Sequence, residues 1–98
     1  MALKFDWDPR KAEANRRKHK VSFAQARDVW HDALAIDELD NREHYAEERF
    51  NRIGMAEGRI LVVTYTTRFD NGDEIVRIIS ARPAEPRERR KYRETRLA

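Results

Sequence analysis

Cysteine is absent from this 98-residue chain, and glycine and proline occur only three times each. The lack of cysteine excludes disulfides and thiolate metal sites. No apolar run approaches the ~20 residues that a membrane-spanning helix needs, and the N-terminus lacks the apolar stretch of a signal peptide. We therefore expect a cytoplasmic protein without membrane association. The chain length predicts one domain over residues 1–98.

Apolar residues are also in short supply. Hydrophobic residues make up 40% of the chain, charged residues another 40%, and the mean hydropathy is −0.96. Such a composition approaches that of disordered chains, which bury too little apolar surface to offset their conformational entropy. Two β-type runs, at residues 59–67 and 74–82, argue for a folded domain instead.

The net charge of +3 is unevenly distributed. Residues 1–20 and residues 82–98 each carry seven Lys or Arg against three Asp or Glu, whereas residues 21–81 carry seven basic and twelve acidic side chains. If the two basic ends meet in the fold, they would attract a polyanion such as RNA. Arg-rich helices can equally serve only to solvate a small domain, and composition does not decide between the two.

The first third of the chain predicts a strand and two helices. Residues 3–7 alternate apolar and polar side chains, as a half-buried strand does. Asp8 and Pro9 suit a helix start, and this helix extends to about Lys20. Ser22 followed by Gln25 forms a capping box for a second helix that reaches about Trp30.

The remainder predicts a sheet and a closing helix. Asn71-Gly72 is a strong hairpin signal between two β-type runs, and the polar residues 37–47 favour a loop. The order is β-α-α-β-β-β-β-α, which indicates an α+β domain with a mainly antiparallel sheet. The expected strands after the helices are residues 33–36, 49–55, 59–67 and 74–82, followed by a helix over 85–96.

Several segments together resemble the BrnT family of toxins. They are Phe5-Asp6-Trp7-Asp8-Pro9, Arg17-Lys18-His19 with Val21-Ser22-Phe23, Arg77-Ile78-Ile79-Ser80-Ala81-Arg82, and Glu88-Arg89 with Tyr92. One departure is Lys20, because the family usually has glycine there, where a left-handed helix end suits glycine.

The resemblance implies a RelE-like fold and ribonuclease activity that arrests translation. It also implies neutralisation by a BrnA-like antitoxin in a hetero-oligomer, a dimer of heterodimers, in which only the antitoxin contacts operator DNA. Metal-independent RNA cleavage by 2′-hydroxyl attack needs a base, an acid and fixed positive charge at the phosphate. We expect no metal and no cofactor, since the three histidines have no zinc-site spacing.

Two arginines are the first catalytic candidates. Arg77 interrupts an apolar β run, so it either faces a cleft as a phosphate clamp or pairs with a carboxylate such as Glu48. Arg82 leaves the same strand just before Pro83 and is freer to reach a ligand.

His19 and Tyr92 complete the catalytic set. His19 ends a basic helix, where the helix dipole favours its protonated form, and it serves either as acid or base or as a surface cap. Tyr92 can donate to a leaving oxygen, although it is also the main apolar anchor of the last helix. His31 and His44 are weaker candidates.

Further polar residues are candidates for RNA binding, and a second class of function stays open. These residues are Lys18, Arg49, Arg68, Ser80 and Arg89. Because no side chain stands out as a base, the alternative is a non-catalytic basic module that binds nucleic acid or an acidic protein partner. A binder retards RNA on a gel, whereas a ribonuclease shortens it.

Overall fold

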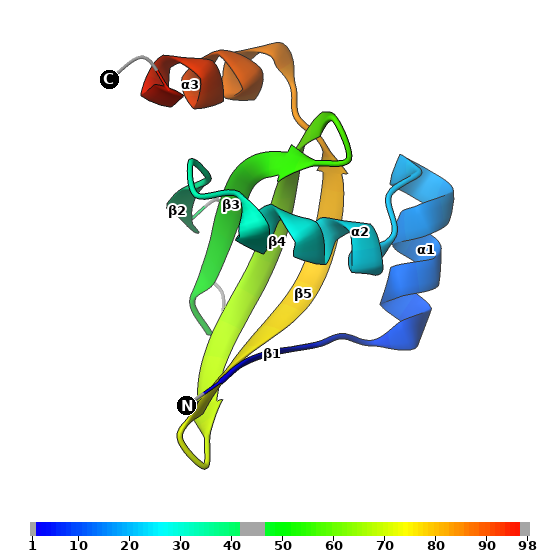
Figure 1. Ribbon diagram of the computed structural model, residues 1–98. Coiled ribbons are helices and arrows are strands. Elements are labelled where there is room, and N and C mark those ends of the chain that lie inside the picture. The colour runs from blue at the N-terminus through cyan, green and yellow to red at the C-terminus, as the bar shows by residue number, and fades with distance from the viewer. Residues whose placement is uncertain (1, 42–46, 97–98) are drawn as a thin grey trace.

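A computed structural model describes residues 2–41 and 47–96 of the chain. One five-stranded sheet, in the order β1-β5-β4-β3-β2, is flanked by helices (Figure 1). The β1–β5 pair is parallel and the other three pairs are antiparallel, so the predicted α+β layout is confirmed. The elements are β1 (Leu3–Asp6), α1 (Pro9–His19), α2 (Phe23–Arg27), the 3-10 helix η1 (Asp28–His31), β2 (Ile36–Asp40), β3 (Arg49–Ala56), β4 (Arg59–Asp70), β5 (Asp73–Pro83) and α3 (Pro86–Arg96).

Local signals in the sequence set most of these boundaries. Asp8 caps α1 by accepting from the Arg10 amide, and Ser22 caps α2 by accepting from the Gln25 amide, as predicted. The expected second helix continues past Arg27 only as the tighter η1. None of the described helices is long and apolar enough to cross a membrane.

Two tight turns hold β3, β4 and β5 together. In the turn at Asn71-Gly72 the φ angles are 52° and 83°, and at Glu57-Gly58 they are 49° and 79°. Two successive positive φ values are the mark of the type I′ turn, whose twist matches that of the strands it joins. The predicted Asn-Gly hairpin is therefore confirmed.

The predicted strand between the second helix and β3 is present, but its bounds of 33–36 were wrong. β2 begins at Ile36, where the predicted strand ends, and runs through part of the predicted loop to Asp40. Asp32 accepts from the Leu34 amide, which folds residues 32–35 into a turn instead. The acidic β2 is stabilised by opposite charge on β3, since Asp37 lies beside Arg52 and pairs with it at 2.5 Å. The rest of the predicted loop, 42–46, lies outside the described residues.

The two faces of the sheet carry separate apolar clusters. Alternation along β4 sends Leu61 and Val63 to the face covered by α1, α2 and η1, and sends Ile60 and Val62 to the opposite face. On that opposite face α3 covers only one end, where Tyr92 packs against the cluster. We call the uncovered remainder of this side of the sheet the open face.

One asparagine replaces a missing strand at the β5 edge. β1 follows β5 only as far as the Asp6–Arg77 pair, and α1 packs beside the strand beyond that point. Asn15, 7% exposed, donates from Nδ2 to the Ala81 carbonyl at 2.8 Å and accepts at Oδ1 from the Ala81 amide at 3.0 Å. Nδ2 also donates to the Val21 carbonyl at 3.0 Å. The side chain thus pairs with β5 as a neighbouring strand's backbone would.

Lys20 ends α1 in a strained conformation. Its φ of 59° and ψ of 33° lie in the left-handed region, and its amide donates to the Arg16 carbonyl. We expect Lys20→Gly to raise the free energy of unfolding by about 0.5–1 kcal/mol, because relief of the side-chain clash exceeds the entropy that glycine adds to the unfolded chain. Thermal melts check this. Lys18→Gly, inside the same helix, should instead lower stability by about 1 kcal/mol, and equal effects of the two changes would contradict the strain argument.

Candidate functional site

Polar side chains on the open face line up in rows across the sheet. Ser80 of β5 lies beside Thr64 of β4, which lies beside Asn51 of β3. The next row toward α3 contains Arg82, and the row on the other side contains Arg77. Neighbouring strands are about 4.8 Å apart, so each row is a continuous strip of side chains.

A β-bulge in β5 brings the strand's polar residues together. Thr64 pairs with Ser80 but Tyr65 pairs with Ile78, which leaves one extra residue on β5 between them. Without it, strict alternation would send Arg77 and Ser80 to opposite faces. The bulge therefore places Arg77, Ser80 and Arg82 on the open face together.

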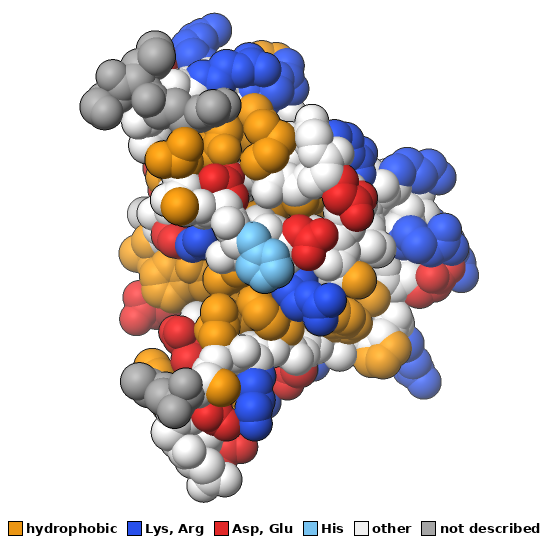
Figure 2. All heavy atoms as spheres, viewed as in Figure 1, with side chains coloured by type: hydrophobic (Ala, Val, Ile, Leu, Met, Phe, Trp, Pro, Cys, Tyr) orange, Lys and Arg blue, Asp and Glu red, His pale blue; other side chains and the backbone are white. Residues whose placement is uncertain are grey.

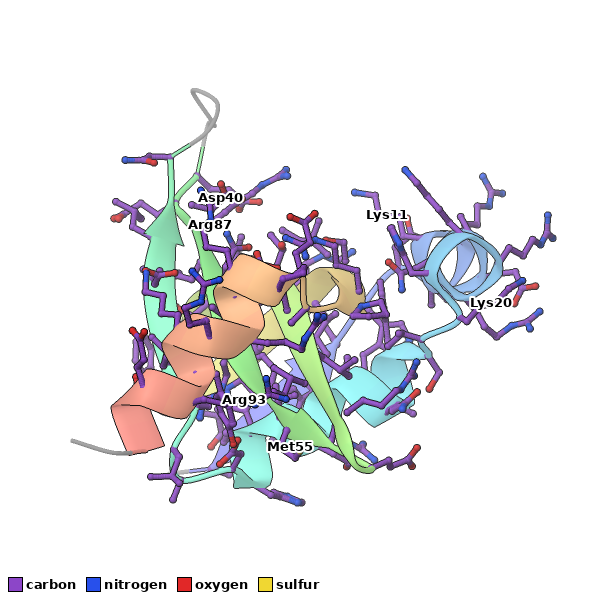
Figure 3. All side chains as sticks on the ribbon, turned by 90° about the horizontal axis from the view of Figure 1, so that it is seen from above. Lys11, Lys20, Asp40, Met55, Arg87 and Arg93 are labelled. Atoms are coloured by element: carbon purple, nitrogen blue, oxygen red, sulfur yellow. The ribbon has the colours of Figure 1, made fainter. Side chains whose placement is uncertain are left out.

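A cleft of about 930 Å³ lies between α3 and the open face. Figure 3 shows Arg87 and Asp40, two of its lining residues, on one side of α3, and Arg93 and Met55 on the other side. Five acidic and four basic side chains are among the lining residues, so positive and negative charges are mixed in the cleft and it is not uniformly cationic. The lining comprises Glu38, Leu39, Asp40, Asn41, Asn51, Ile53, Arg82, Glu85, Arg87, Glu88, Arg90, Lys91 and Glu94.

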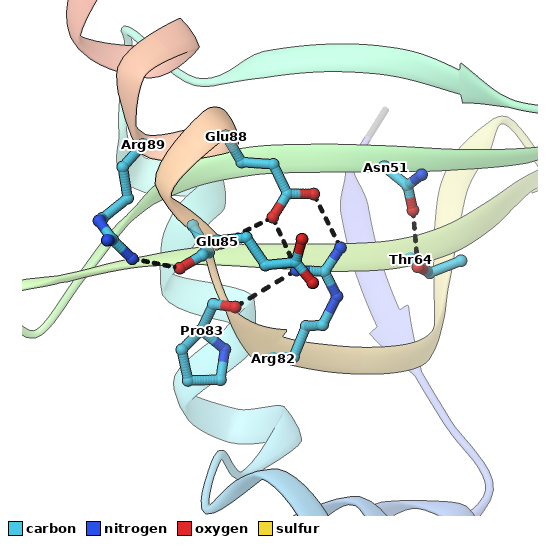
Figure 4. A network of polar contacts seen from close by, with 8 residues as sticks. Asn51, Thr64, Arg82, Pro83, Glu85, Glu88 and Arg89 are labelled. Atoms are coloured by element: carbon cyan, nitrogen blue, oxygen red, sulfur yellow. Dashed lines mark hydrogen bonds and ion pairs between the residues drawn. The ribbon is translucent and has the colours of Figure 1, made fainter.

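Arg82 is held in this cleft by a two-pronged ion pair with Glu88 (Figure 4). Its Nη1 and Nη2 atoms lie 2.7 Å from the two carboxylate oxygens of Glu88. The same carboxylate accepts from the Glu85 amide at the start of α3. The hydrogen bonds from Arg82 lower the pKa of Glu88, more than burial raises it. Glu88 is therefore ionised, and it orients the planar guanidinium of Arg82.

His19 lies near the same point, and its pKa is shifted in the direction opposite to the expected one. Burial lowers the pKa of His19, and the positive charges of Lys18 and Arg82 lower it further below the usual 6.5. The prediction that the helix dipole favours the protonated form was wrong, because these neighbours outweigh it. A neutral imidazole can accept a proton, which suits a general base.

Arg77 is paired, but not with the predicted carboxylate. Its Nη1 lies 3.0 Å from Asp6 on the parallel strand β1, and Arg68 binds the other oxygen of Asp6 at 3.0 Å. Burial acts to raise the pKa of Asp6, but the two arginines outweigh it and hold that pKa below its usual value. The Arg77 side chain is 44% exposed, so this is a solvent-accessible cluster of net positive charge. The proposed pairing with Glu48 was wrong because β1, not the segment before β3, adjoins Arg77.

Tyr92 belongs to α3, and its side chain is buried against the sheet. It is 2% exposed and packs against Ile53 and Val62. Its hydroxyl donates to Asp32 Oδ2 at 2.6 Å, and this carboxylate oxygen of Asp32 also accepts from the Met55 amide. The ring and hydroxyl together fasten α3 to the end of the sheet.

The other candidates that the structure describes do not line the cleft and lie on several different elements. Lys18 is exposed on α1, and Arg49 is half-buried on the open face of β3. Arg89 donates to the Ala84 carbonyl at 2.6 Å and so fastens the start of α3. His31 is exposed on η1, while His44 lies outside the described residues. The fold therefore brings Arg82, Ser80 and His19 to one end of β5 and leaves Arg68 and Arg77 toward its other end.

Both basic helices meet β5 at consecutive residues. α1 binds Ala81 through Asn15, and α3 binds Arg82 through Glu88. Figure 2 shows Lys and Arg side chains gathered over α3 and along α1, with hydrophobic and acidic groups between. The two cationic ends of the sequence therefore flank the same end of the sheet.

Three contributors to this site were not singled out from the sequence: Asn51, Thr64 and Glu88 as the partner of Arg82. Asn51 and Thr64 are ordinary strand residues until the register places them in one row with Ser80. Glu88 lies six residues after Arg82, with Pro83 between, and the spacing alone does not show that α3 turns back. In the described part of the chain, no three His, Asp or Glu side chains gather as metal ligands.

Comparison with known proteins identifies a family. A family model described as ribonuclease toxin, BrnT, of type II toxin–antitoxin system matches residues 7–88. The match covers most of the chain, from the residue after β1 to Glu88 at the start of α3. No curated protein sequence matches the chain.

Proposed function

This chain belongs to the BrnT family of ribonuclease toxins of type II toxin–antitoxin systems, and from this we propose that it cleaves RNA without a metal ion in the cleft beside α3. The observation that carries the proposal is the position of the Arg82 guanidinium. Glu88 orients it in that cleft, and its positive charge is close enough to His19 to lower the pKa of His19. Family membership implies an RNA target and an antitoxin partner.

The reaction divides between these side chains. Neutral His19 accepts the proton of a ribose 2′-hydroxyl, and the 2′-oxygen bonds to the adjacent phosphorus. The bond from phosphorus to the 5′-oxygen breaks, which leaves a 2′,3′-cyclic phosphate, and the departing oxygen takes a proton from solvent. Arg82 stabilises the charge that builds up on the phosphorane oxygens. Glu88 acts through Arg82, as a positioning residue.

Arg77 and Arg68 form a second phosphate site in this proposal. Arg77 and Arg82 are five residues apart on the same face of β5, or about 15 Å at the rise of a strand. This separation suits different phosphates of one RNA strand laid along the open face. Ser80 lies between them and can contact the backbone that connects those phosphates.

Incubation of purified protein with RNA in EDTA tests the proposal directly. We expect fragments ending in a cyclic phosphate, and no fragments from a folded His19→Gln, Arg82→Ala double variant. Retarded but intact RNA would indicate the non-catalytic binding module instead. Cleavage that disappears in EDTA and returns with a divalent cation would show that the metal-independent mechanism is wrong.

The pH profile of cleavage should report His19. Activity falls as pH falls through the pKa of His19, because the imidazolium cannot accept a proton, and the lowered pKa places that limb below pH 6.5. Lys18→Gln removes a nearby positive charge, so it should move the acid limb to higher pH. Lys11→Gln, the same charge change elsewhere on α1, is the matched control. An acid limb that persists in His19→Gln would rule out this assignment.

The antitoxin, by this proposal, is a BrnA-like protein that neutralises the toxin by covering Arg77 and Arg82. A partly acidic segment laid along the open face would pair these charges and exclude RNA. Expression of the toxin alone in the cytoplasm should stop protein synthesis, and co-expression of the partner should restore it. A structure of the complex, a dimer of heterodimers by family analogy, that left both arginines open to solvent would contradict the covering model.

A further inference from the structure

Between the two arginine sites, the open face offers neutral hydrogen-bonding groups. The row Ser80, Thr64, Asn51 carries no charge. Arg82 belongs to the next row on the same face of the sheet. A nucleotide whose phosphate is bound at Arg82 would lay its base over this row. Sequence-selective RNA recognition works in this way, through side chains that contact the exposed edges of unpaired bases.

Asn51 is the one amide in this row, and its orientation is determined by a neighbour. The Thr64 hydroxyl, on a residue only 7% exposed, donates to Asn51 Oδ1 at 2.7 Å. Figure 4 shows the nitrogen of the amide turned away from Thr64. Asn51 lines the cleft, and no acceptor for its Nδ2 exists among the described residues. The cleft therefore contains a pair of N–H donors held in place.

We propose that Asn51, positioned by Thr64, selects the base of the bound RNA by donating to the exocyclic oxygen at position 4 of a pyrimidine. The proposal rests on RNA binding in the cleft and deepens it by naming the preferred bases. Uracil carries a carbonyl oxygen at position 4, which accepts a hydrogen bond from an N–H donor. Cytosine carries an amino group there, which is itself a donor and cannot accept one. The toxin should thus favour keto bases over amino bases at this position.

Binding of two single-stranded hexamers, oligouridylate and oligocytidylate, tests the inference without relying on cleavage. The two ligands have the same backbone and ring size and differ in the group that faces Asn51. We expect the wild-type protein to bind oligouridylate more tightly, on the order of tenfold per discriminating contact. Equal affinity, or preference for oligocytidylate, would overturn the proposal.

Asn51→Asp reverses the chemistry of the site at nearly constant shape. A carboxylate accepts and cannot donate, so this variant should reverse the order and prefer oligocytidylate. The added negative charge weakens the binding of both oligonucleotides by the same factor, so this factor drops out of the ratio of the two affinities. Asn71→Asp, at the tip of the β4–β5 hairpin, adds the same charge away from the cleft and should leave the ratio unchanged.

Thr64→Val tests the positioning role. It removes the hydroxyl that orients the amide, so Asn51 can present either its oxygen or its nitrogen to the base. The uridylate preference should then fall toward unity while the variant melts near the wild-type temperature. A ratio unchanged by Asn51→Asp and Thr64→Val would overturn the inference. In contrast, wild-type protein that shows the preference but never shortens RNA would contradict only the proposed ribonuclease mechanism.

Discussion

Arg82→Lys should lose cleavage rate on the order of 100-fold, the usual cost of removing one preorganised donor to a developing oxyanion. Lysine keeps the positive charge opposite Glu88 but cannot form the planar two-pronged contact that Arg82 makes with it. The guanidinium plane is what we expect the phosphorane to need, so kcat should fall more than KM rises. Single-turnover cleavage of a defined RNA measures the chemical step itself.

Arg77→Lys is the matched comparison, because it is the same change on the same face of β5. Arg77 belongs to the second phosphate site, so its variant should chiefly raise KM and leave kcat within severalfold of wild type. Both variants should melt within a few degrees of the wild-type protein, since Arg77 is an exposed side chain and the lysine that replaces Arg82 retains the charge. A larger kcat loss at Arg77 than at Arg82 would move the reaction centre to the Asp6–Arg77 end of the strand.

Asn15→Asp should destabilise the fold by at least ~3 kcal/mol. The substitution keeps the shape of the side chain but removes both donors, which leaves the Val21 and Ala81 carbonyls unpaired. It also places a carboxylate among carbonyl oxygens in a buried position. For a domain of this size the melting temperature should fall by more than ~12 °C.

The deficit of the Asn15→Asp variant should shrink in acid. Burial beside carbonyl oxygens raises the pKa of the new carboxyl, so its protonated form is favoured in the folded state and regains one donor. The stability gap to wild type should therefore widen as pH rises and narrow toward about pH 4, the ordinary pKa of the carboxyl. Asn71→Asp, exposed in the hairpin turn, serves as the control and should change stability little. A melting temperature near that of the wild type would show that Asn15 does not hold the β5 edge.

The parts of the fold that were predicted correctly depend on neighbours in sequence. Helix caps at Asp8 and Ser22 and the turn at Asn71-Gly72 act over a few residues, and the structure shows each of them. The bounds of the strand before β3 were predicted wrongly, because the prediction followed the short apolar run at 33–36. The structure instead forms a turn there, in which Asp32 accepts from the Leu34 amide. β2 itself is mostly acidic, and its stability comes from arginine on the next strand.

The site was harder to predict because its geometry depends on long-range pairing. Arg77 and Arg82 could be singled out as cations in a β run, yet their partners come from β1 and α3. The lowered pKa of His19 follows from burial, from its neighbour Lys18 and from Arg82, and no local pattern reveals the burial or places Arg82 beside α1. Asn51 joined the site only once the register between β3 and β4 was known.

Because α1 blocks part of the outer edge of β5, the two edges of the sheet differ in whether they can pair with another strand. On one side, β1 occupies the first half of the outer edge of β5, and Asn15 occupies the backbone groups of Ala81 farther on. On the other side, no described strand pairs with the outer edge of β2. Among the described residues, the edge that an extra strand would find open, from a partner or from aggregation, is therefore that of β2. On that edge Asp37 pairs with Arg52 and Glu38 pairs with Lys91, so an added strand must leave these two ion pairs in place or replace them.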